Sequence, residues 1–540
     1  MTDTLTHLSP EAIGREDNAL AELIRDRSFT YFEHTYLESA NGERRISFRA
    51  LECAVEHWLV QFEEVRLARG ATVAIAVADP IDFSAVFLAV IASGRWAAPL
   101  DPEASVRDDG GPVHALSRVR ADFIVADRPL PGGSDTRGAD LLGAPSLFLG
   151  FAPGRTDTRP ASTGSSGPPV QDGGVVLSSS GTTGIPKLIA LHQRQLLHTA
   201  RHVAEHHQLS TSDRGFNPLP LFHINAEVVG LLATLVAGSS LILDDRFHRT
   251  NFWETMRDHH VTWINAVPAI IARLAEPDSD EIIPPNIRFI RSASAPLPAT
   301  TMTRFEERTG IAVLETYGMT EAASQITANP LYGTRKPGSV GRPVGVELRI
   351  VPEFRPADSG LVAGGQEATG HVEIRGPSVI TAYGGEECRE VIDADGWLRT
   401  GDLGHLDEDG YLHLDGRTDD VINRGGEKVF PREIEEAILA DPGVAAVSVI
   451  GEPDPVLGQV PVAFLVLHGI GGASDRDMAR HVVARIRRNL DSAFVRAKRP
   501  VALHVVLQLP VGATGKVQRR ALREHDVLVI HYVGTSAATT

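Results

Sequence analysis

The feature that most constrains the fold is the stretch at residues 175–187, which reads VVLSSSGTTGIPK. A short apolar run, typical of a buried strand, leads into a loop of hydroxyl side chains and glycines that ends at Lys187. Gly181 and Gly184 allow sharp turns that present backbone N–H groups to an anion, and the lysine adds a point charge. It is not a Walker A loop, because Ile185 and Pro186 separate the last glycine from the lysine. A flexible Ser/Gly turn is the alternative, but the flanking strand and lysine favour a loop that binds a polyphosphate.

The chain length and the net charge limit the classes of protein to which this chain can belong. A chain of 540 residues is too long for one hydrophobic core, so two or more domains are expected. The net charge of -17 disfavours a nucleic-acid partner. Cys53 and Cys388 form no metal or redox motif, which suits a reducing compartment. The polar amino terminus lacks a signal pattern, and the apolar runs from Phe83 and Val228 are too short to span a bilayer. These features predict a cytoplasmic protein.

The order of apolar patterns predicts an α/β architecture. The run from Phe48 has helical spacing, ATVAIAVAD from Ala71 reads as a buried parallel strand, and FSAVFLAVIASG from Phe83 reads as a helix. Repeated strand–helix units of this kind favour a parallel sheet with helices on its faces. A Pro/Gly/Ser-rich connection at about residues 150–174 then precedes the loop described above.

A second boundary is expected near Gly416. Upstream, HVEIRGP, GWLRTGDLGHLDEDG and YLHLDG have the alternation and turn residues of short strands. Downstream, REIEEAILAD is an amphipathic helix, and VAAVSVIGEPD and VPVAFLVLHG are strands. We therefore predict a domain over residues 1–416 and a compact α+β domain over residues 417–540, within the usual size range.

The loop SSSGTTGIPK resembles the phosphate loop of the adenylate-forming superfamily, which includes acyl-CoA synthetases, peptide-synthetase adenylation domains and luciferases. Further segments resemble the family's motifs, in the family's order, along nearly the whole chain. They are RWAAPLDP (95–102), LPLFHINA (219–226), SASAPLP (292–298), YGMTEA (317–322), KPGSVGRP (336–343), TGD (400–402), GRTDDVINRGGEKVFP (416–431) and GATGKVQR (512–519). Together they look closest to the oxalate–CoA ligase branch.

The resemblance implies a fold and a reaction. The fold would be α/β: a large N-terminal domain of stacked α/β subdomains with a small β-barrel, plus a small mobile α+β C-terminal domain hinged at Asp419. The reaction would join a carboxylate to AMP from ATP and Mg²⁺, then transfer the acyl group to coenzyme A. The alternative is a different acceptor or substrate: a separate carrier protein, an amine, or nitrite activated to a diazo product. A non-catalytic relative is disfavoured, because Lys516, Glu321 and Asp402 are present. A monomer or a homodimer is expected.

The side chain of each expected site residue also suits its expected role chemically. Tyr317 offers a flat ring for adenine, and Thr320 and Glu321 offer hard oxygens for Mg²⁺. Asp402 suits the paired hydroxyls of a ribose, and Arg417 adds a fork of donors. By resemblance, Lys516 holds the carboxylate against the α-phosphate, offsetting the repulsion of two anions. The remaining nucleotide-binding residues implied by the family are Ser179, Ser180, Gly181, Thr182, Thr183, Gly184, Lys187, Ser294, Ala295, Pro296, Thr316, Gly318 and Met319, with Thr183 joining Glu321 as a metal ligand.

The acceptor and the acid would bind around two further segments. Arg424, Gly425 and Gly426 would line the path of the pantetheine arm, because glycines leave room beside their backbone. The acid pocket would include His223, Asn225, Ser292, Ser294, Gly318, Met319, Ala323 and Ser324. The oxalate branch reads PLFHVHG and TEASH, so Asn225 and Ser324 replace histidines here, leaving fewer donors for a small dianion. We therefore expect an acid other than oxalate, such as an aromatic or branched one.

Overall fold

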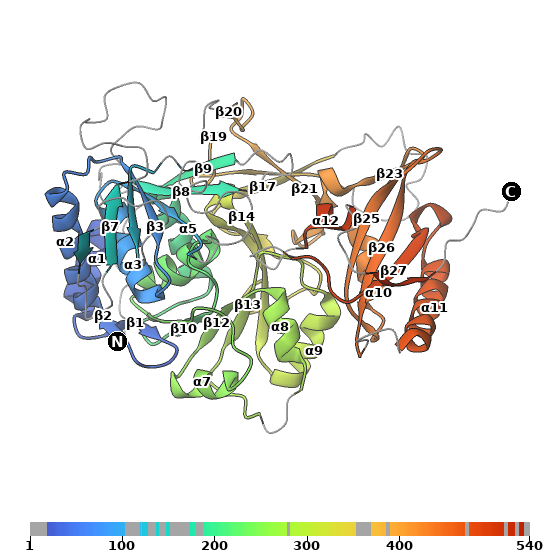
Figure 1. The fold of residues 1–540 in the computed structure, drawn as a ribbon, viewed down its shortest axis with the longest axis horizontal. Helices are drawn as coiled ribbons and strands as arrows, with labels where there is room; N and C mark the ends of the chain where they lie inside the picture. Colours follow the sequence, from blue (N-terminus) through green and yellow to red (C-terminus); the bar gives the residue numbers. More distant parts are fainter. Residues whose placement is uncertain are drawn as a thin grey trace.

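The computed structural model divides into a large part, ending near Arg417, and a smaller part after it (Figure 1). It describes residues 19–102, 119, 121–127, 137–139, 147–151, 173–179, 187–277, 281–352, 369–384, 389–469, 475–511, 517–523 and 529–533. Each part has its own hydrophobic clusters: those of the small part contain only residues from Ile422 onward. None of the helices in the described ranges has the length and apolarity that crossing a membrane would require.

A seven-stranded mixed sheet carries the predicted phosphate loop at one edge. Its order is β6 (Arg137–Ala139), β7 (Leu147–Phe151), β5 (Phe123–Ala126), β3 (Thr72–Ala76), β4 (Trp96–Pro99), β8 (Gly174–Ser179) and β9 (Lys187–His192). β3, β4, β5 and β8 are parallel, as the sequence pattern predicts, whereas β9 returns antiparallel to β8. The predicted helices form as α2 (Phe48–Glu64) and α3 (Pro80–Ala92). α3 is buried on every side, which explains its continuous apolar sequence.

A nine-stranded sheet forms the centre of the large part. Its order is β16 (Arg342–Pro343), β15 (Ser324–Ala328), β14 (Ala312–Met319), β13 (Phe289–Ser292), β12 (Trp263–Ala266), β10 (Arg214–Asn217), β11 (Ser240–Leu243), β1 (Thr35–Ser39) and β2 (Arg45–Ser47). Strands β1 and β10 to β14 run parallel, and β2, β15 and β16 are antiparallel additions. Besides α2 and α3, the described helices of the large part are α1 (Ala19–Tyr31), α5 (Gln193–His206), the π-helix η2 (Ala226–Leu232), α6 (Ala233–Ala237), α7 (Phe252–Asp258), α8 (Pro268–Ala275), α9 (Ala299–Thr309) and the short helix η3 (Thr320–Ala322).

A four-stranded antiparallel sheet closes the large part on the side of the small one. It contains β17 (Glu347–Pro352), β18 (Gly370–Arg375), β21 (Leu398–Leu406) and β22 (Leu412–Arg417), and a separate pair is formed by β19 (Ala382–Tyr383) and β20 (Arg389–Glu390). The resemblance implies a small barrel at this place. In the described ranges β17 and β22 do not pair with each other, and Leu412 of β22 instead exchanges backbone hydrogen bonds with Val340 and Gly341.

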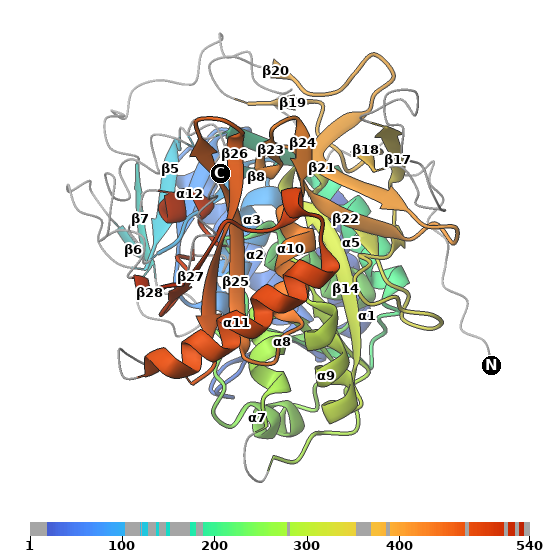
Figure 2. The same ribbon diagram turned by 90° about the vertical axis from the view of Figure 1, so that its right-hand side faces the viewer.

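The small part combines a six-stranded sheet with helices, as predicted. The sheet contains β23 (Ile422–Arg424), β24 (Glu427–Val429), β25 (Val444–Asp454), β26 (Gly458–Leu467), β27 (Ala502–Val506) and β28 (Val529–Val533). The helices are α10 (Pro431–Leu439), α11 (Arg476–Ala493), η6 (Arg496–Lys498) and α12 (Arg519–Arg523). Figure 2, viewed from the side of the small part, shows α10 and α11 crossing in front of the large part. The short helix η4 (Thr418–Asp420) connects β22 to β23.

Candidate active site

The predicted site is organised around the end of β14 and the short helix η3 (Thr320–Ala322) that follows it. Only glycine fits at position 318, because an added Cβ would lie 1.6 Å from the carbonyl oxygen of Ser324. Ala323 and Ser324 have φ angles of 53° and 94°, and Ser294 has a φ of 74°. Non-glycine residues rarely adopt this left-handed backbone, and such strain is concentrated at functional sites.

Tyr317 and Asp402 meet although they lie far apart in the sequence. The Tyr317 hydroxyl donates a hydrogen bond to Asp402 Oδ2, and Arg417 Nη1 donates to Asp402 Oδ1 at 3.2 Å. The register of β21 and β22 pairs Asp402 directly with Arg417. Burial, together with the neighbouring carboxylate, raises the pKa of Tyr317 well above its ordinary value. The residues predicted to bind adenine and ribose therefore lie together.

Lys187 and Glu321 are joined by Tyr383, a residue that the sequence reasoning missed. The Tyr383 hydroxyl donates to Glu321 Oε1 at 3.0 Å, and Lys187 Nζ lies 4.6 Å from the centre of the Tyr383 ring. The backbone N–H of Gly384 donates to the carbonyl oxygen of Leu188 at 2.8 Å, which fixes β19 beside β9. No motif signalled Tyr383, because it contacts both residues only in the folded chain.

The predicted phosphate loop begins and ends at a defined place. Ser179 pairs with Lys187 at the end of the β8–β9 hairpin, so residues 180–186 connect these two positions. Ser180, Gly181, Thr182, Thr183, Gly184 and the side chain of Ser179 lie outside the described residues. Their predicted contacts with phosphate and metal remain predictions.

The segment after β13 lies against β14. Thr316 Oγ1 donates to the carbonyl oxygen of Ser292 at 3.0 Å, and the backbone N–H of Leu297 donates to Glu315 Oε1 at 3.3 Å. Of the two residues expected to cover the base, Ala295 is half-buried and Pro296 is exposed. Burial raises the pKa of Glu315 to about 7, and Arg432 of the small part opposes that rise. The charge of Arg432 on α10 therefore acts on the carboxyl group of Glu315 beside the predicted base-binding segment.

One of the predicted acid-binding residues, Asn225, contacts a buried cation that the sequence did not predict, Arg291. Asn225 is buried and accepts a hydrogen bond from Arg291 Nη1 at 2.8 Å. His223 lies in the turn before η2, and Ala323 and Ser324 are buried beside β14. Arg291 lies within RSASAPLP, and a charged residue in the apolar strand FIRS was the available signal for it.

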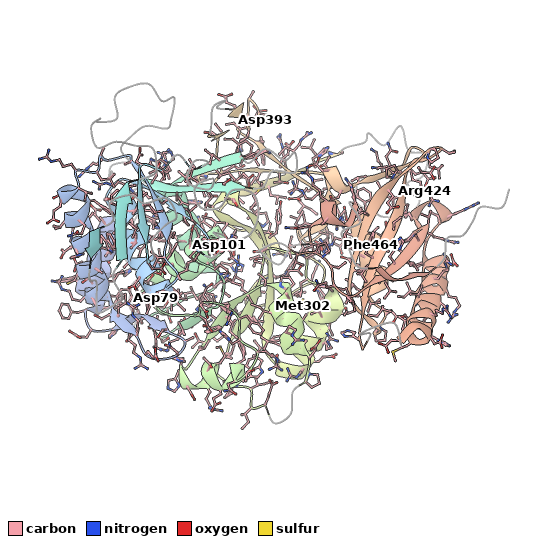
Figure 3. The ribbon with its side chains drawn as sticks, in the orientation of Figure 1. Asp79, Asp101, Met302, Asp393, Arg424 and Phe464 are labelled. Carbon is pink, nitrogen blue, oxygen red and sulfur yellow. The ribbon has the colours of Figure 1, made fainter. Side chains whose placement is uncertain are left out.

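The predicted CoA-path residues lie on the small part, and their visible contacts are internal to it. Arg424 Nη1 donates to the carbonyl oxygens of Arg496, Ala497 and Arg499, and Figure 3 shows it on the side of the small part away from β14. Gly425 and Gly426 are exposed, with φ angles of 61° and 94°.

The segment around the predicted hinge connects the two parts. Asp419 is exposed in η4, and its neighbour Asp420 pairs with Arg519 at 3.2 Å. Lys516 lies outside the described residues, but Val517 follows it directly and Arg519 lies two residues further on. The end of the predicted lysine loop is therefore tied to the segment that contains the predicted hinge.

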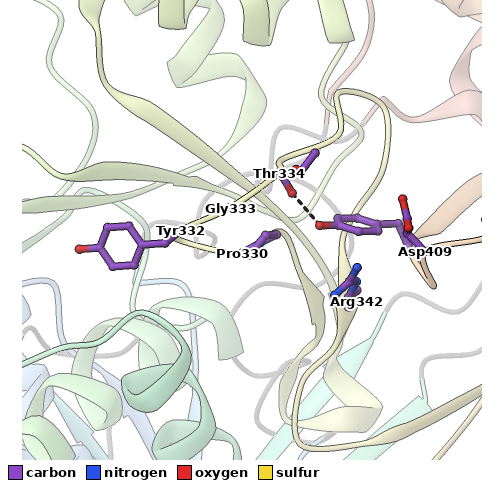
Figure 4. Close-up of a pocket in the computed structure, with 7 residues that line it drawn as sticks. Pro330, Tyr332, Gly333, Thr334, Arg342 and Asp409 are labelled. Atoms are coloured by element: carbon purple, nitrogen blue, oxygen red, sulfur yellow. Dashed lines mark hydrogen bonds between the residues drawn. The ribbon is translucent and has the colours of Figure 1, made fainter.

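Two other features of the large part are separate from this site. A pocket is lined by Pro330, Tyr332, Gly333, Thr334, Arg342, Asp409 and Tyr411 (Figure 4). Asp244, Asp245 and His248 form a group with metal-ligand spacing after β11. None of the predicted site residues belongs to either feature.

Comparison with known proteins gives the family. The AMP-binding enzyme family matches residues 25–384, and its C-terminal domain matches residues 433–516. The chain is 36% identical to the sulfoacetate–CoA ligase of Cupriavidus necator over 94% of this chain and 98% of that one. It is 34% identical to the oxalate–CoA ligase of Arabidopsis thaliana over 84% and 88%.

A solved structure of a ligase shows the same fold with ATP and magnesium ion bound. The o-succinylbenzoate coenzyme A synthetase of Bacillus subtilis, in complex with ATP and magnesium ion, aligns with a TM-score of 0.71 and 25% identity, covering 93% of this chain and 98% of that one. The predicted fold class, superfamily and cofactors are confirmed. The chain belongs to the AMP-binding enzyme family, as an acid–thiol ligase that forms an acyl-adenylate from a carboxylic acid and ATP and then a thioester with coenzyme A.

Proposed function

We propose that the segment from Tyr317 to Glu321 positions both ends of ATP for attack by the acid. The Tyr317 ring stacks on adenine, and Asp402 and Arg417 hold the ribose. Lys187 and the loop that precedes it bind the β- and γ-phosphates. The observation that carries this proposal is that one continuous segment contacts Asp402 at its start and Tyr383 at its end.

The residues at the phosphate end fit a magnesium ion. Glu321 is half-buried, presents a carboxylate in the middle of η3, and has Thr320 directly beside it. Such hard oxygen ligands suit Mg²⁺, with Thr183 as a further candidate. When bound, the ion neutralises phosphate charge. Tyr383 orients Glu321 through its hydrogen bond and lies over Lys187, so this chain itself fixes the distance between cation and carboxylate.

The two half-reactions divide between two loops of the small part. In the first, a carboxylate oxygen attacks the α-phosphorus and pyrophosphate leaves, while Lys516 holds the two anions together. In the second, the thiol sulfur attacks the acyl carbon and AMP leaves. We assign the domain boundary to residue 416 and the hinge to Asp419, whose exposed position between β22 and β23 supports a rotation. That rotation would bring Arg424, Gly425 and Gly426 to the site.

The acid lies between the segment containing His223 and Asn225 and the residues Ser292, Ala323 and Ser324. The relatives are named for sulfoacetate, oxalate and o-succinylbenzoate. The replacements at Asn225 and Ser324 support an acid other than oxalate here. The cytoplasm, where ATP and coenzyme A are available, is the proposed location, and a monomer or homodimer is the proposed assembly. A separate carrier protein as acceptor is the alternative.

The test is acid-dependent exchange of labelled pyrophosphate into ATP, followed by thioester analysis with and without coenzyme A. We expect exchange with one class of acid and a thioester only when coenzyme A is present. Measurable ATP binding without exchange for any acid would contradict the proposed roles. Exchange without a CoA thioester would redirect the acceptor toward a carrier protein or an amine.

A further inference from the structure

Arg291 places a buried positive charge beside the predicted acid pocket. It lies on the central strand β13, between β12 and β14, and its exposure is 1%. In the part of the chain that the structure describes, no carboxylate forms an ion pair with it, and burial lowers its pKa to about 9. Arginine therefore stays charged at neutral pH, and an uncompensated buried charge is costly. Packing alone does not explain why an arginine is buried at this position.

Side-chain amide oxygens accept the hydrogen bonds of this guanidinium, and N–H donors of the same cluster remain available. Arg291 donates to Asn225 Oδ1 at 2.8 Å, Asn265 Oδ1 at 3.3 Å and Gln325 Oε1 at 3.3 Å. Among the residues that the structure describes, none accepts a hydrogen bond from the buried atoms Asn225 Nδ2, Gln325 Nε2 and Arg291 Nε. All three are donors, and buried donors are nearly always satisfied. The group that satisfies several donors beside a guanidinium is an anion with several oxygens.

The neighbouring residues place this cluster in the acid pocket. Asn225 follows His223 by two positions and is the N-cap residue of the π-helix η2, a helix type often found at functional sites. Gln325 pairs in register with Gly318, at the end of β14. His206 and His207 also face Arg291, but burial and the arginine lower the pKa of both, so they add no charge.

We propose that Arg291, Asn225 and Gln325 bind a second anionic group, a carboxylate or a sulfonate, at the far end of the acid that the enzyme adenylates. This inference rests on the proposed function, because it requires the acid to lie between His223 and β14. The sequence predicted few donors for a dianion, because Asn225 and Ser324 replace two histidines of the oxalate branch. Arg291 supplies a cation in their place. Arg291 and its two amides are therefore specificity-determining residues.

The experiment compares matched acids by pyrophosphate exchange. Malonate and succinate test a second carboxylate, and sulfoacetate tests a sulfonate. Propionate, butyrate, isobutyrate and benzoate are the singly charged acids. We expect kcat/KM for at least one doubly charged acid to exceed its singly charged match by roughly 30-fold or more, the effect of charge-assisted hydrogen bonds. Equal or better exchange with singly charged acids would overturn the inference while leaving the proposed function intact. No exchange with any acid would overturn both.

Two variants test the residues themselves. Asn225→Asp keeps the side-chain shape and supplies the anion from the protein, so it should reduce the ratio of kcat/KM for doubly charged to singly charged acids by roughly 30-fold or more. Arg291→Met should reduce the same ratio. Arg304→Met, on the exposed face of α9, is the control and should leave the ratio unchanged. An unchanged ratio in a folded, ATP-binding Asn225→Asp variant would overturn the inference, even if Arg291→Met fails to fold.

Discussion

The hydroxyl of Tyr383 donates a hydrogen bond to Glu321 Oε1 at 3.0 Å while the same ring lies 4.6 Å from Lys187 Nζ. One side chain thus connects the residue proposed to hold the metal with the residue proposed to bind phosphate. The geometry makes Tyr383 a positioning residue for the phosphate end of ATP, although no motif contains it. It lies on β19, which is held beside β9 by the Gly384–Leu188 backbone hydrogen bond.

Tyr383→Phe should weaken the use of Mg·ATP without abolishing chemistry. The ring over Lys187 stays, but the hydrogen bond that orients Glu321 is lost, so we expect KM for Mg·ATP to rise roughly tenfold, as for the loss of one charged hydrogen bond. The measurement is pyrophosphate exchange across a titration of Mg·ATP. Tyr332→Phe, at an exposed tyrosine in the separate pocket, is the matched control. A Tyr383→Phe enzyme with unchanged KM would argue against the positioning role.

The contact between Tyr317 and Asp402 predicts a graded loss of nucleotide affinity. Tyr317→Phe keeps the stacking ring but removes the hydrogen bond to Asp402, so ATP affinity should fall by roughly threefold to tenfold. Asp402→Ala removes the acceptor for both Tyr317 and Arg417, so its loss should be larger. Calorimetric titration with ATP measures both. Equal affinities for wild type and Asp402→Ala would remove Asp402 from the nucleotide site.

The sequence predicted the strands and helices well where one local pattern decides the outcome. The apolar segments that form the helix α3 and the strands β25 and β26 are examples, because an apolar run reports burial directly. Motif order also named Tyr317, Asp402 and Arg417, and the structure brings these three together.

Tyr383, Glu315 and Arg291 could not be found in this way. Their partners lie on other strands or in the small part, and sequence spacing does not encode such contacts. Arg291 shows the limit most clearly. A charged residue inside the apolar strand FIRS is unusual in sequence. Only the fold shows that amide oxygens of the described residues accept the hydrogen bonds of Arg291.

The two loops of the small part should separate the two half-reactions. Lys516→Ala should slow acid-dependent pyrophosphate exchange by about a hundredfold or more, because the charge between two anions is lost. It should leave thioester formation from supplied acyl-adenylate nearly unchanged. Gly426→Ala should do the reverse, since alanine is strained at a φ of 94° and the hairpin would shift. Both half-reactions are assayed for each variant. If each variant slowed both equally, the assignment of the two loops to separate steps would be wrong.

Glu315 should make stability depend on pH in a defined direction. Burial raises its pKa from 4.5 to about 7, while Arg432 and the Leu297 N–H oppose the rise and Glu436 adds to it. The folded state therefore binds the proton more tightly than the unfolded state. Its stabilising contribution is complete below the ordinary carboxyl pKa and is lost as the pH rises toward 7, by at most about 3 kcal/mol.

Glu315→Gln should remove this dependence, because glutamine keeps the shape and does not ionise. Between about pH 5 and about pH 8, the Tm of wild type should fall relative to that of Glu315→Gln by a few degrees. Thermal unfolding at both pH values measures the difference, with Glu307→Gln on the exposed face of α9 as control. A constant Tm difference across this range would show that Glu315 titrates in the folded protein as it does in the unfolded chain. The charges of Arg432 and Glu436 on α10 would then not affect the stability of the protein through Glu315.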